Sequence, residues 1–197
     1  MTIAIDIDEV LADTLNSYIK YHNNTYNTSL KREQFFTYNW WEVLQIEFNE
    51  GATRFNDFVN KGYFENLPLV KGAKQAVIKL KENHNLAIVT SRMGELKAIT
   101  KKWINKNFPG CFLKIYHTKS VYDKNAITKH QACLKSRADI LIEDDINFAS
   151  ECMNNGIKVL LVDRPWNRDF EVLTNAVRVH SWDDILQQVK NVTASCK

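Results

Sequence analysis

Short apolar runs recur along most of the chain and predict strands that alternate with helices. The runs are rich in β-branched residues and cover residues 3–7, 86–90, 113–117, 139–142, 158–162 and 176–179. Between them, apolar side chains repeat with a helical spacing over residues 73–80 and again over 182–189, where Ser181 is a suitable N-cap. Strands that alternate with helices pair in parallel through crossover connections, so we predict an α/β fold with a doubly wound, mostly parallel sheet.

One stretch breaks this alternation. Residues 16–70 contain no convincing strand pattern and are crowded with aromatic side chains. We therefore predict a small helical cap over 16–70, inserted after the first strand, and an α/β core domain of residues 1–15 and 71–197. Large rings can simply form the core of so small a domain, but ligand sites favour clefts between domains with aromatic walls.

Composition and charge narrow the classes of partner. The chain has 197 residues, with 26 Lys and Arg against 23 Asp and Glu, and a formal net charge of +3. Because the basic residues form no dense block, we expect no nucleic acid polymer as a partner. No apolar run approaches the roughly 18 residues of a membrane helix, and the amino terminus opens on an apolar strand instead of a signal peptide. We expect a cytoplasmic protein without a membrane partner.

The cysteines argue against a structural zinc site. Cys111, Cys133, Cys152 and Cys196 are widely spaced and include no close pair of the kind that zinc sites use. We expect reduced thiols, as in a reducing compartment.

Polar side chains follow three of the predicted strands, at the edge where α/β sheets bind ligands. The first strand runs into Asp6 and Asp8, and the second ends at Thr90. The fourth ends in the acidic run 143–145, and Lys129 lies in the helical segment before it. Each residue alone is typical of a turn, a helix cap or a solvated surface. Together, in this order, they predict a site.

The chemistry that these residue types suit is phosphoryl transfer. Asp6 and Asp8 share one face of an extended backbone, and Asp144 would add a third negative charge, which is unfavourable unless a cation is bound. Oxygen ligands beside a phosphate favour Mg²⁺. The Thr90 hydroxyl and the Lys129 charge suit phosphate oxygens. One carboxylate is then left to attack phosphorus and another to carry the proton.

In these motifs the sequence resembles the haloacid dehalogenase-like phosphatase superfamily. The motifs read IAIDIDEVLAD over residues 3–13, IVTSR over 88–92, a lysine at 129 and LIEDD over 141–145. A closer resemblance, to the 5′(3′)-deoxyribonucleotidase family and its bacterial relatives, rests on three features. These are the helical cap directly after the first motif, VDRPWNR over 162–168 and VHSW over 179–182. The resemblance covers nearly the whole chain and is weakest in the cap.

The resemblance implies a role for each motif residue. Asp6 would be the nucleophile that becomes an aspartyl-phosphate, and Asp8 the general acid and base. Thr90, Ser91 and Lys129 would bind the phosphate. The implied fold is a Rossmann-like core with a cap after the first strand.

The resemblance also implies a Mg²⁺ cofactor. Asp6, the backbone carbonyl of Asp8, and Asp144 would hold the ion. The fourth motif also offers Glu143 and Asp145, so the ligand is ambiguous by one residue, although alignment of the motif favours Asp144.

One residue departs from the family pattern, and the choice of the lysine in the third motif is open. Glu9 stands where many relatives have Gly. Lys124 and Lys135 flank Lys129 and are alternative choices for the third motif.

The expected function is a Mg²⁺-dependent phosphomonoester hydrolase, in particular a 5′-nucleotidase for (deoxy)nucleoside monophosphates. A phosphatase for another small ester, such as a sugar phosphate, is the alternative. A phospho-receiver module also uses Asp, Thr and Lys, but its lysine comes last, whereas Lys129 precedes the acidic run. A non-catalytic Mg²⁺-binding module is disfavoured because every catalytic residue type is present.

The cap is expected to discriminate between substrates, since phosphate binding is common to all esters. Phe36, Trp40 and Trp41 are the candidates for contact with the substrate, and Tyr38 lies among them. The rival interpretation is that the tryptophans form the core of the cap.

Overall fold

A six-stranded parallel sheet forms the centre of the computed structural model, which describes residues 1–92, 94, 96–120, 126–171 and 175–195. Its strands, in chain order, are β1 (Thr2–Ile5), β2 (Asn85–Thr90), β3 (Ile115–His117), β4 (Ile140–Glu143), β5 (Lys158–Val162) and β6 (Ala176–Val179). They lie in the order β3-β2-β1-β4-β5-β6, with every pair parallel. The predicted doubly wound α/β fold is confirmed.

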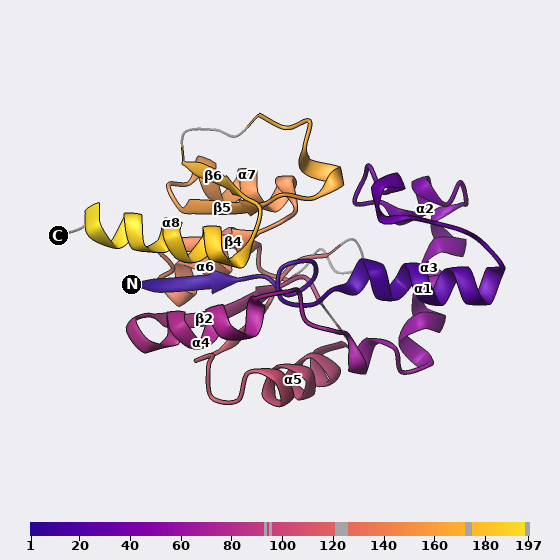
Figure 1. Ribbon diagram of the computed structural model, residues 1–197, viewed down its shortest axis with the longest axis horizontal. Coiled ribbons are helices and arrows are strands. Elements are labelled where there is room, and N and C mark those ends of the chain that lie inside the picture. The colour runs from indigo at the N-terminus through magenta and orange to yellow at the C-terminus, as the bar shows by residue number, and fades with distance from the viewer. Residues whose placement is uncertain (93, 95, 121–125, 172–174, 196–197) are drawn as a thin grey trace.

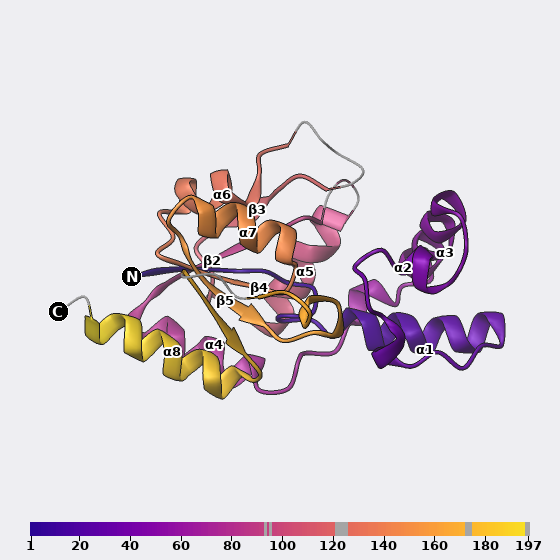
Figure 2. The same cartoon turned by 90° about the horizontal axis from the view of Figure 1, so that it is seen from above.

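Helices cover both faces of the sheet (Figure 2). They are α4 (Ala73–Asn83), α5 (Leu96–Asn107), α6 (Lys129–Ser136), α7 (Ile146–Asn154) and α8 (Trp182–Ser195). Because strand side chains alternate between faces, Ile3 and Ile5 pack in the cluster that includes α4, α5 and α8, and Ala4 packs with α6 and α7. Ser181 accepts a hydrogen bond from the Asp184 backbone N–H at 3.1 Å, so its predicted capping role is confirmed.

The segment from α1 to η2 lies beyond the carboxyl ends of the strands, on the side to which β1 points (Figure 1). Its elements are α1 (Thr14–Tyr26), η1 (Arg32–Gln34), α2 (Trp40–Val43), α3 (Phe48–Asn60) and η2 (Phe64–Asn66). All of residues 16–70 are described, and they form no strand beyond the single bridge residue Leu69. We call residues 16–70 the cap, as an interpretation of this arrangement.

The topology decides where a site can form. The chain runs from β1 outward through β2 to β3, then returns to pair β4 with the other side of β1. Ile5 therefore pairs with Ile88 on one side and Ile142 on the other. Connections that depart in opposite directions leave a crevice at the carboxyl ends of the central strands, and ligands of α/β proteins bind there. Asp6 leaves β1 at this point.

Two remaining expectations concern membranes and cysteines. Within the described part of the chain, no helix combines the length and apolar character needed to cross a bilayer. Cys111, Cys133 and Cys152 are buried free thiols, and Cys196 lies outside the described residues.

Candidate active site

A buried lysine joins two carboxylates at the centre of the crevice. Lys129 Nζ lies 3.1 Å from Asp6 Oδ1 and 2.6 Å from Glu143 Oε2. The lysine is the first residue of α6, which Thr128 caps through a hydrogen bond to the Gln131 backbone N–H. Burial lowers the pKa of Lys129, but the charges of Asp6 and Glu143 outweigh it, so the net pKa lies above the ordinary lysine value. The ammonium is therefore a permanent positive charge in this site.

Glu143 acts as the fixed counter-charge of that lysine. Its other oxygen, Oε1, accepts the backbone N–H groups of Asp144 and Asp145, at 3.0 and 3.1 Å. Both carboxylate oxygens of Glu143 are thus occupied. Asp6 differs, because within the described part of the chain its Oδ1 makes no hydrogen bond of acceptable geometry, even though Lys129 lies close to it. Burial raises the pKa of Asp6 to about 7, even though Lys129 opposes the shift.

Oxygens suitable for a hard cation face the same space. Donor atoms of Asp6, Glu143 and Asp144 lie within 4.8 Å of one another. Oδ1 of Asp144 is also buried without a hydrogen-bond partner in the described structure. Burial, followed by the neighbouring carboxylates, raises the pKa of Asp144 well above its usual value. Buried oxygens without partners are unfavourable, so the donor set fits Mg²⁺ held by Asp6 and Asp144.

The neighbouring acid, Asp145, has a different task. Its Oδ1 accepts the backbone N–H of Asn147 at 2.7 Å, which makes it the N-cap of α7. The geometry therefore favours Asp144 over Asp145 as the metal ligand.

Residues of the loop after β5 donate hydrogen bonds to Asp144. The indole N–H of Trp166, in the turn η3 (Pro165–Asn167), donates to Asp144 Oδ2 at 3.0 Å. The Asn167 side-chain amide donates to the Asp144 backbone carbonyl at 2.8 Å. Both groups come from the 162–168 segment.

Asp8 points to a separate cluster. Arg92 donates to both of its oxygens, from Nε at 2.8 Å and from Nη2 at 2.6 Å, and the Thr14 hydroxyl adds a bond of 2.5 Å. Burial raises the pKa of Asp8, but the charge and hydrogen bonds of Arg92 and the bond from Thr14 outweigh it, so the pKa lies below the usual value. The side chain of Asp8 is thus held ionised beside the crevice, outside the group of possible metal ligands.

Thr90 ends β2 and Ser91 follows it, directly before Arg92, the partner of Asp8. Thr90 is fully buried, and its hydroxyl accepts the Arg92 backbone N–H at 3.3 Å. Ser91 is half-buried. The lysine that contacts Asp6 is Lys129, whereas Lys135 is exposed and Lys124 lies outside the described residues.

Glu9 connects the core with the cap. Its backbone has φ 61°, in the left-handed region that glycine adopts most easily. Its carboxylate accepts the Leu15 backbone N–H at 2.6 Å and forms an ion pair with Arg32 of the cap. Its carbonyl accepts a hydrogen bond from Arg164 Nε at 3.1 Å. The residue that departs from the family pattern therefore has a structural role.

The candidate aromatic residues lie in different surroundings. Trp40 packs in the cap, with its ring centroid 4.7 Å from that of Tyr18 and 5.9 Å from that of Phe55. Trp41 packs edge-on against Phe48 at 5.0 Å. The Trp41 Cβ lies only 2.7 Å from where a side chain at position 51 would begin, so Gly51 permits this contact. Both tryptophans are parts of the cap packing.

Phe36 and Tyr38 are more accessible. Phe36 is 67% exposed. The ring of Tyr38 meets Trp166 edge-on at 6.1 Å. Burial of its hydroxyl, followed by the negative charges of Asp144 and Asp6, raises the pKa of Tyr38 well above the usual value. Tyr38 is thus linked to the acidic cluster through Trp166, which contacts it and also donates to Asp144.

Sequence reasoning gave no role to Arg92 or Trp166. Arg92 stood within the second motif, directly after Thr90 and Ser91, but nothing in its spacing indicated that it would face Asp8. Trp166 stood in a segment that carried the family resemblance. Its contact with Asp144 joins residues 22 positions apart and needs the three-dimensional structure.

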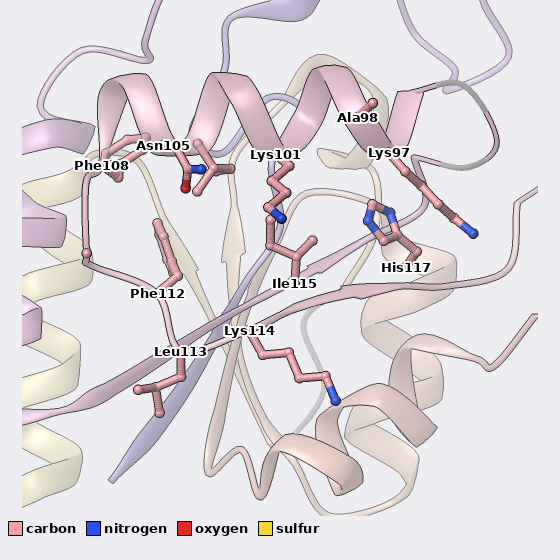
Figure 3. Close-up of a pocket in the computed structure, with 12 residues that line it drawn as sticks. Lys97, Ala98, Lys101, Asn105, Phe108, Phe112, Leu113, Lys114, Ile115 and His117 are labelled. Atoms are coloured by element: carbon pink, nitrogen blue, oxygen red, sulfur yellow. The ribbon is translucent and has the colours of Figure 1, made fainter.

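A groove elsewhere on the molecule is separate from this cluster. It has a volume of about 490 Å³ and lies between α5 and β3, with Lys101, Phe112 and Ile115 among its lining residues (Figure 3). It includes none of the carboxylates of the crevice. We place the site at the crevice because the charged and unpartnered groups gather there.

Known proteins resemble the chain over almost its full length. The family model described as 5′ nucleotidase, deoxy (Pyrimidine), cytosolic type C protein matches residues 1–195. A nucleotidase of Clostridium acetobutylicum is 27% identical, over 94% of this chain and 91% of its own. A 5′(3′)-deoxyribonucleotidase of Bacillus subtilis is also 27% identical, over 93% and 95%.

A solved structure shows the same fold. The haloacid dehalogenase-like hydrolase SP0104 of Streptococcus pneumoniae superposes with a TM-score of 0.69 at 13% identity, over 95% of this chain and 97% of the other. The family match, the relatives and this fold agree with the family that the motifs resemble. The chain is a phosphatase with the fold of haloacid dehalogenase-like hydrolases, and it belongs to the family of 5′ nucleotidase, deoxy (Pyrimidine), cytosolic type C proteins.

Proposed function

We propose that the chain is a Mg²⁺-dependent 5′-nucleotidase that hydrolyses (deoxy)nucleoside monophosphates through an aspartyl-phosphate on Asp6. One observation carries the proposal: a buried Asp6 carboxylate, 3.1 Å from Lys129, shares its space with the carboxylate of Asp144, whose Oδ1 has no hydrogen-bond partner among the described residues. The names of the relatives support the substrate class, since they include a nucleotidase and a 5′(3′)-deoxyribonucleotidase.

In the first half of the reaction, a carboxylate oxygen of Asp6 attacks phosphorus. A bond forms between that oxygen and phosphorus, and the ester P–O bond breaks. The leaving oxygen takes a proton from Asp8, which must therefore reach it in the protonated form. Lys129, Thr90 and Ser91 bind the phosphate oxygens and balance the charge that develops on them.

In the second half, water hydrolyses the acyl phosphate. Asp8 removes a proton from the water, whose oxygen bonds to phosphorus while the bond to Asp6 breaks, which releases inorganic phosphate. The pairing of Asp8 with Arg92 suits this step, because it keeps the carboxylate ionised and oriented. In the first half of the reaction, the leaving oxygen and the Arg92 guanidinium must both approach the carboxyl group of Asp8, so they compete for it.

Asp6 and Asp144, with the backbone carbonyl of Asp8, would hold Mg²⁺. When bound, the ion neutralises negative charge on the phosphate and on the carboxylates around it. Lys129 supplies one positive charge to the phosphate oxygens, but Glu143 and Asp6 already balance that charge, so a further cation is needed for the phosphate.

Phosphate release from a substrate panel tests the proposal. The panel holds ribo- and deoxyribonucleoside 5′- and 3′-monophosphates, several sugar phosphates and p-nitrophenyl phosphate, each assayed with Mg²⁺ and with a chelator. We expect nucleoside monophosphates to give the highest kcat/KM, and activity to vanish with chelator and return with Mg²⁺. A higher kcat/KM for sugar phosphates would contradict the substrate class. Full activity in chelator would contradict the metal requirement.

A further inference from the structure

The turn η3 is fixed to the backbone of the predicted metal ligand. Asn167 is buried, and its side-chain amide donates to the backbone carbonyls of Asp144 and Val162, both at 2.8 Å. Arg178 in turn donates to Asn167 Oδ1 at 2.6 Å. Both polar atoms of the Asn167 side-chain amide therefore have hydrogen-bond partners, which fix the position of the turn relative to Asp144.

From this turn, Trp166 reaches the Asp144 carboxylate itself. The indole N–H donates to Oδ2 at 3.0 Å, while Oδ1 of the same carboxylate is buried without a hydrogen-bond partner in the described structure. An indole N–H is a donor only, so it can bind this oxygen but cannot compete with it for a cation. The two oxygens of Asp144 are thereby made unequal.

The indole of Trp166 also contacts the cap. Tyr38 meets it edge-on at 6.1 Å between ring centroids, and the guanidinium carbon of Arg32 lies 5.7 Å from the ring centroid. Arg32 is also the cap partner of Glu9. Trp166 therefore lies between the cap and the acidic cluster and contacts both.

We propose that Trp166 is a positioning residue for Mg²⁺: its N–H occupies Oδ2 of Asp144 and so presents Oδ1 as the single ligand oxygen. The inference rests on the Mg²⁺ site of the proposed function. Mg²⁺ requires near-ideal octahedral geometry, so a carboxylate that rotates freely or binds through both oxygens is a poorer ligand. Hydrogen bonds that orient metal ligands change metal affinity by about 10–100-fold when they are removed.

A purely structural role for Trp166 makes a different prediction. If the ring only fills space between cap and core, its replacement by another ring should leave metal binding unchanged. Trp166→Phe keeps an aromatic ring for Tyr38 and Arg32 and removes the N–H. The matched control is Trp182→Phe, because Trp182 also donates an indole hydrogen bond, to the Val10 carbonyl at 3.1 Å, in the core.

Binding of Mn²⁺ to substrate-free protein measures the effect directly. Mn²⁺ serves as the probe for the Mg²⁺ site, and the electron paramagnetic resonance signal of the free ion gives the dissociation constant. We expect Trp166→Phe to raise the dissociation constant for Mn²⁺ about tenfold or more. We expect Trp182→Phe to lower thermal stability and to leave the dissociation constant for Mn²⁺ unchanged. Trp166→His, which retains a ring N–H, should recover part of the affinity. Trp166→Leu replaces the phenylalanine variant if the latter does not fold.

Several outcomes overturn the inference. One is a dissociation constant within twofold of wild type in folded Trp166→Phe, and another is equal affinity in the Phe and His variants. A wild-type chain that binds no Mn²⁺ also overturns it. Failure of the proposed function would be seen in a different experiment, the phosphate-release assay, in which the wild-type chain would release no phosphate from nucleotides. Even with that result, weaker Mn²⁺ binding by Trp166→Phe would still support the positioning role of Trp166.

Discussion

Arg92 holds both carboxylate oxygens of Asp8 by hydrogen bonds, at 2.8 and 2.6 Å, although the two residues are 84 positions apart in the sequence. The guanidinium carbon also lies 4.2 Å from the ring centroid of Phe64, in η2. The proposed general acid and base is therefore oriented by a cation that packs against the end of the cap segment. Its geometry depends on both parts of the fold.

We expect Arg92→Lys to lower kcat for nucleotide hydrolysis by roughly 10²-fold, with a smaller change in KM. Lysine keeps the charge but cannot form the paired, planar contact, and a misplacement of about 1 Å in a catalytic group can reduce the rate by that amount. Steady-state kinetics measure the effect. The control is Arg54→Lys, which changes an arginine of the cap that pairs with Glu50. Equal kcat values in the two variants would contradict an orienting role for Arg92.

Asp6→Asn should abolish turnover and leave the fold intact or slightly more stable. An amide cannot form the acyl phosphate. Burial raises the pKa of Asp6 to about 7, so the site already favours an uncharged group at this position over an ionised one. Phosphate release and thermal unfolding, both without added metal and with Mg²⁺, measure the two effects. Full activity in a folded Asp6→Asn variant would exclude the covalent mechanism.

Asp144→Ala and Asp145→Ala should fail in different ways. Loss of Asp144 removes a proposed metal ligand, so the Mg²⁺ concentration for half-maximal activity should rise strongly. Loss of Asp145 removes the cap of α7, which should lower the free energy of unfolding by about 0.5–2 kcal/mol with little change in the Mg²⁺ requirement. Mg²⁺ titrations of activity and urea unfolding curves separate the two. A larger Mg²⁺ effect in Asp145→Ala would move the ligand by one residue.

Trp40→Ala is expected to destabilise the cap without selecting between substrates. The ring packs among Tyr18, Phe35 and Phe55, and such truncations lower stability by about 3–5 kcal/mol. Hydrolysis of nucleotides and of p-nitrophenyl phosphate should decline in parallel, as measured by kcat/KM for each. A loss confined to nucleotides would identify Trp40 as a substrate contact, the alternative that the sequence also predicts.

Tyr38→Ala should discriminate between the same two substrates. Tyr38 is the cap aromatic that is linked to the acidic cluster through Trp166, so it can stack against the nucleoside while the phosphate lies below it. Base stacking is worth about 1–3 kcal/mol, which corresponds to roughly tenfold or more in kcat/KM for nucleotides. Hydrolysis of p-nitrophenyl phosphate should fall less. Equal losses for both substrates would show that the Tyr38 ring stabilises the site and does not stack on the nucleobase.

His22 should make the protein lose stability in mild acid. Arg54 donates to Nε2 at 2.8 Å, so this nitrogen must be unprotonated, and Nδ1 lies 2.9 Å from the Thr28 hydroxyl. Burial, followed by the charge of Arg54, lowers the pKa of His22 below 6.5. The unfolded chain therefore binds a proton first as the pH falls through about 6.5, and stability declines from there.

Urea unfolding at pH 7.5 and at pH 5.5 tests this expectation. The decline should be smaller in His22→Gln than in wild type, although part of it should remain, because the pKa values of His84 and His117 are also lowered by burial. An identical decline in both proteins would contradict the role of His22.

The sequence alone determined the fold class and the positions of the charged motifs. Apolar runs of strand length and helical spacing are local properties, and parallel pairing follows from their alternation. Because parallel strands end at a common edge, the motifs at strand ends had to meet there, and Asp6, Lys129 and Asp144 do so. The family match and the fold agree with the family resemblance, whereas the roles that the resemblance implies for these residues stay predictions.

Only the tertiary structure decided how the side chains pair. Whether Asp8 faces a metal or Arg92, and whether Asp144 or Asp145 keeps a free oxygen, depends on contacts between residues far apart in the sequence. The same holds for the aromatic residues of the cap. Trp40 and Tyr38 are two positions apart and have the same apolar and aromatic character, yet one packs inside the cap and the other contacts Trp166. Burial and charge pairing arise from the packing of whole elements, which no local pattern encodes.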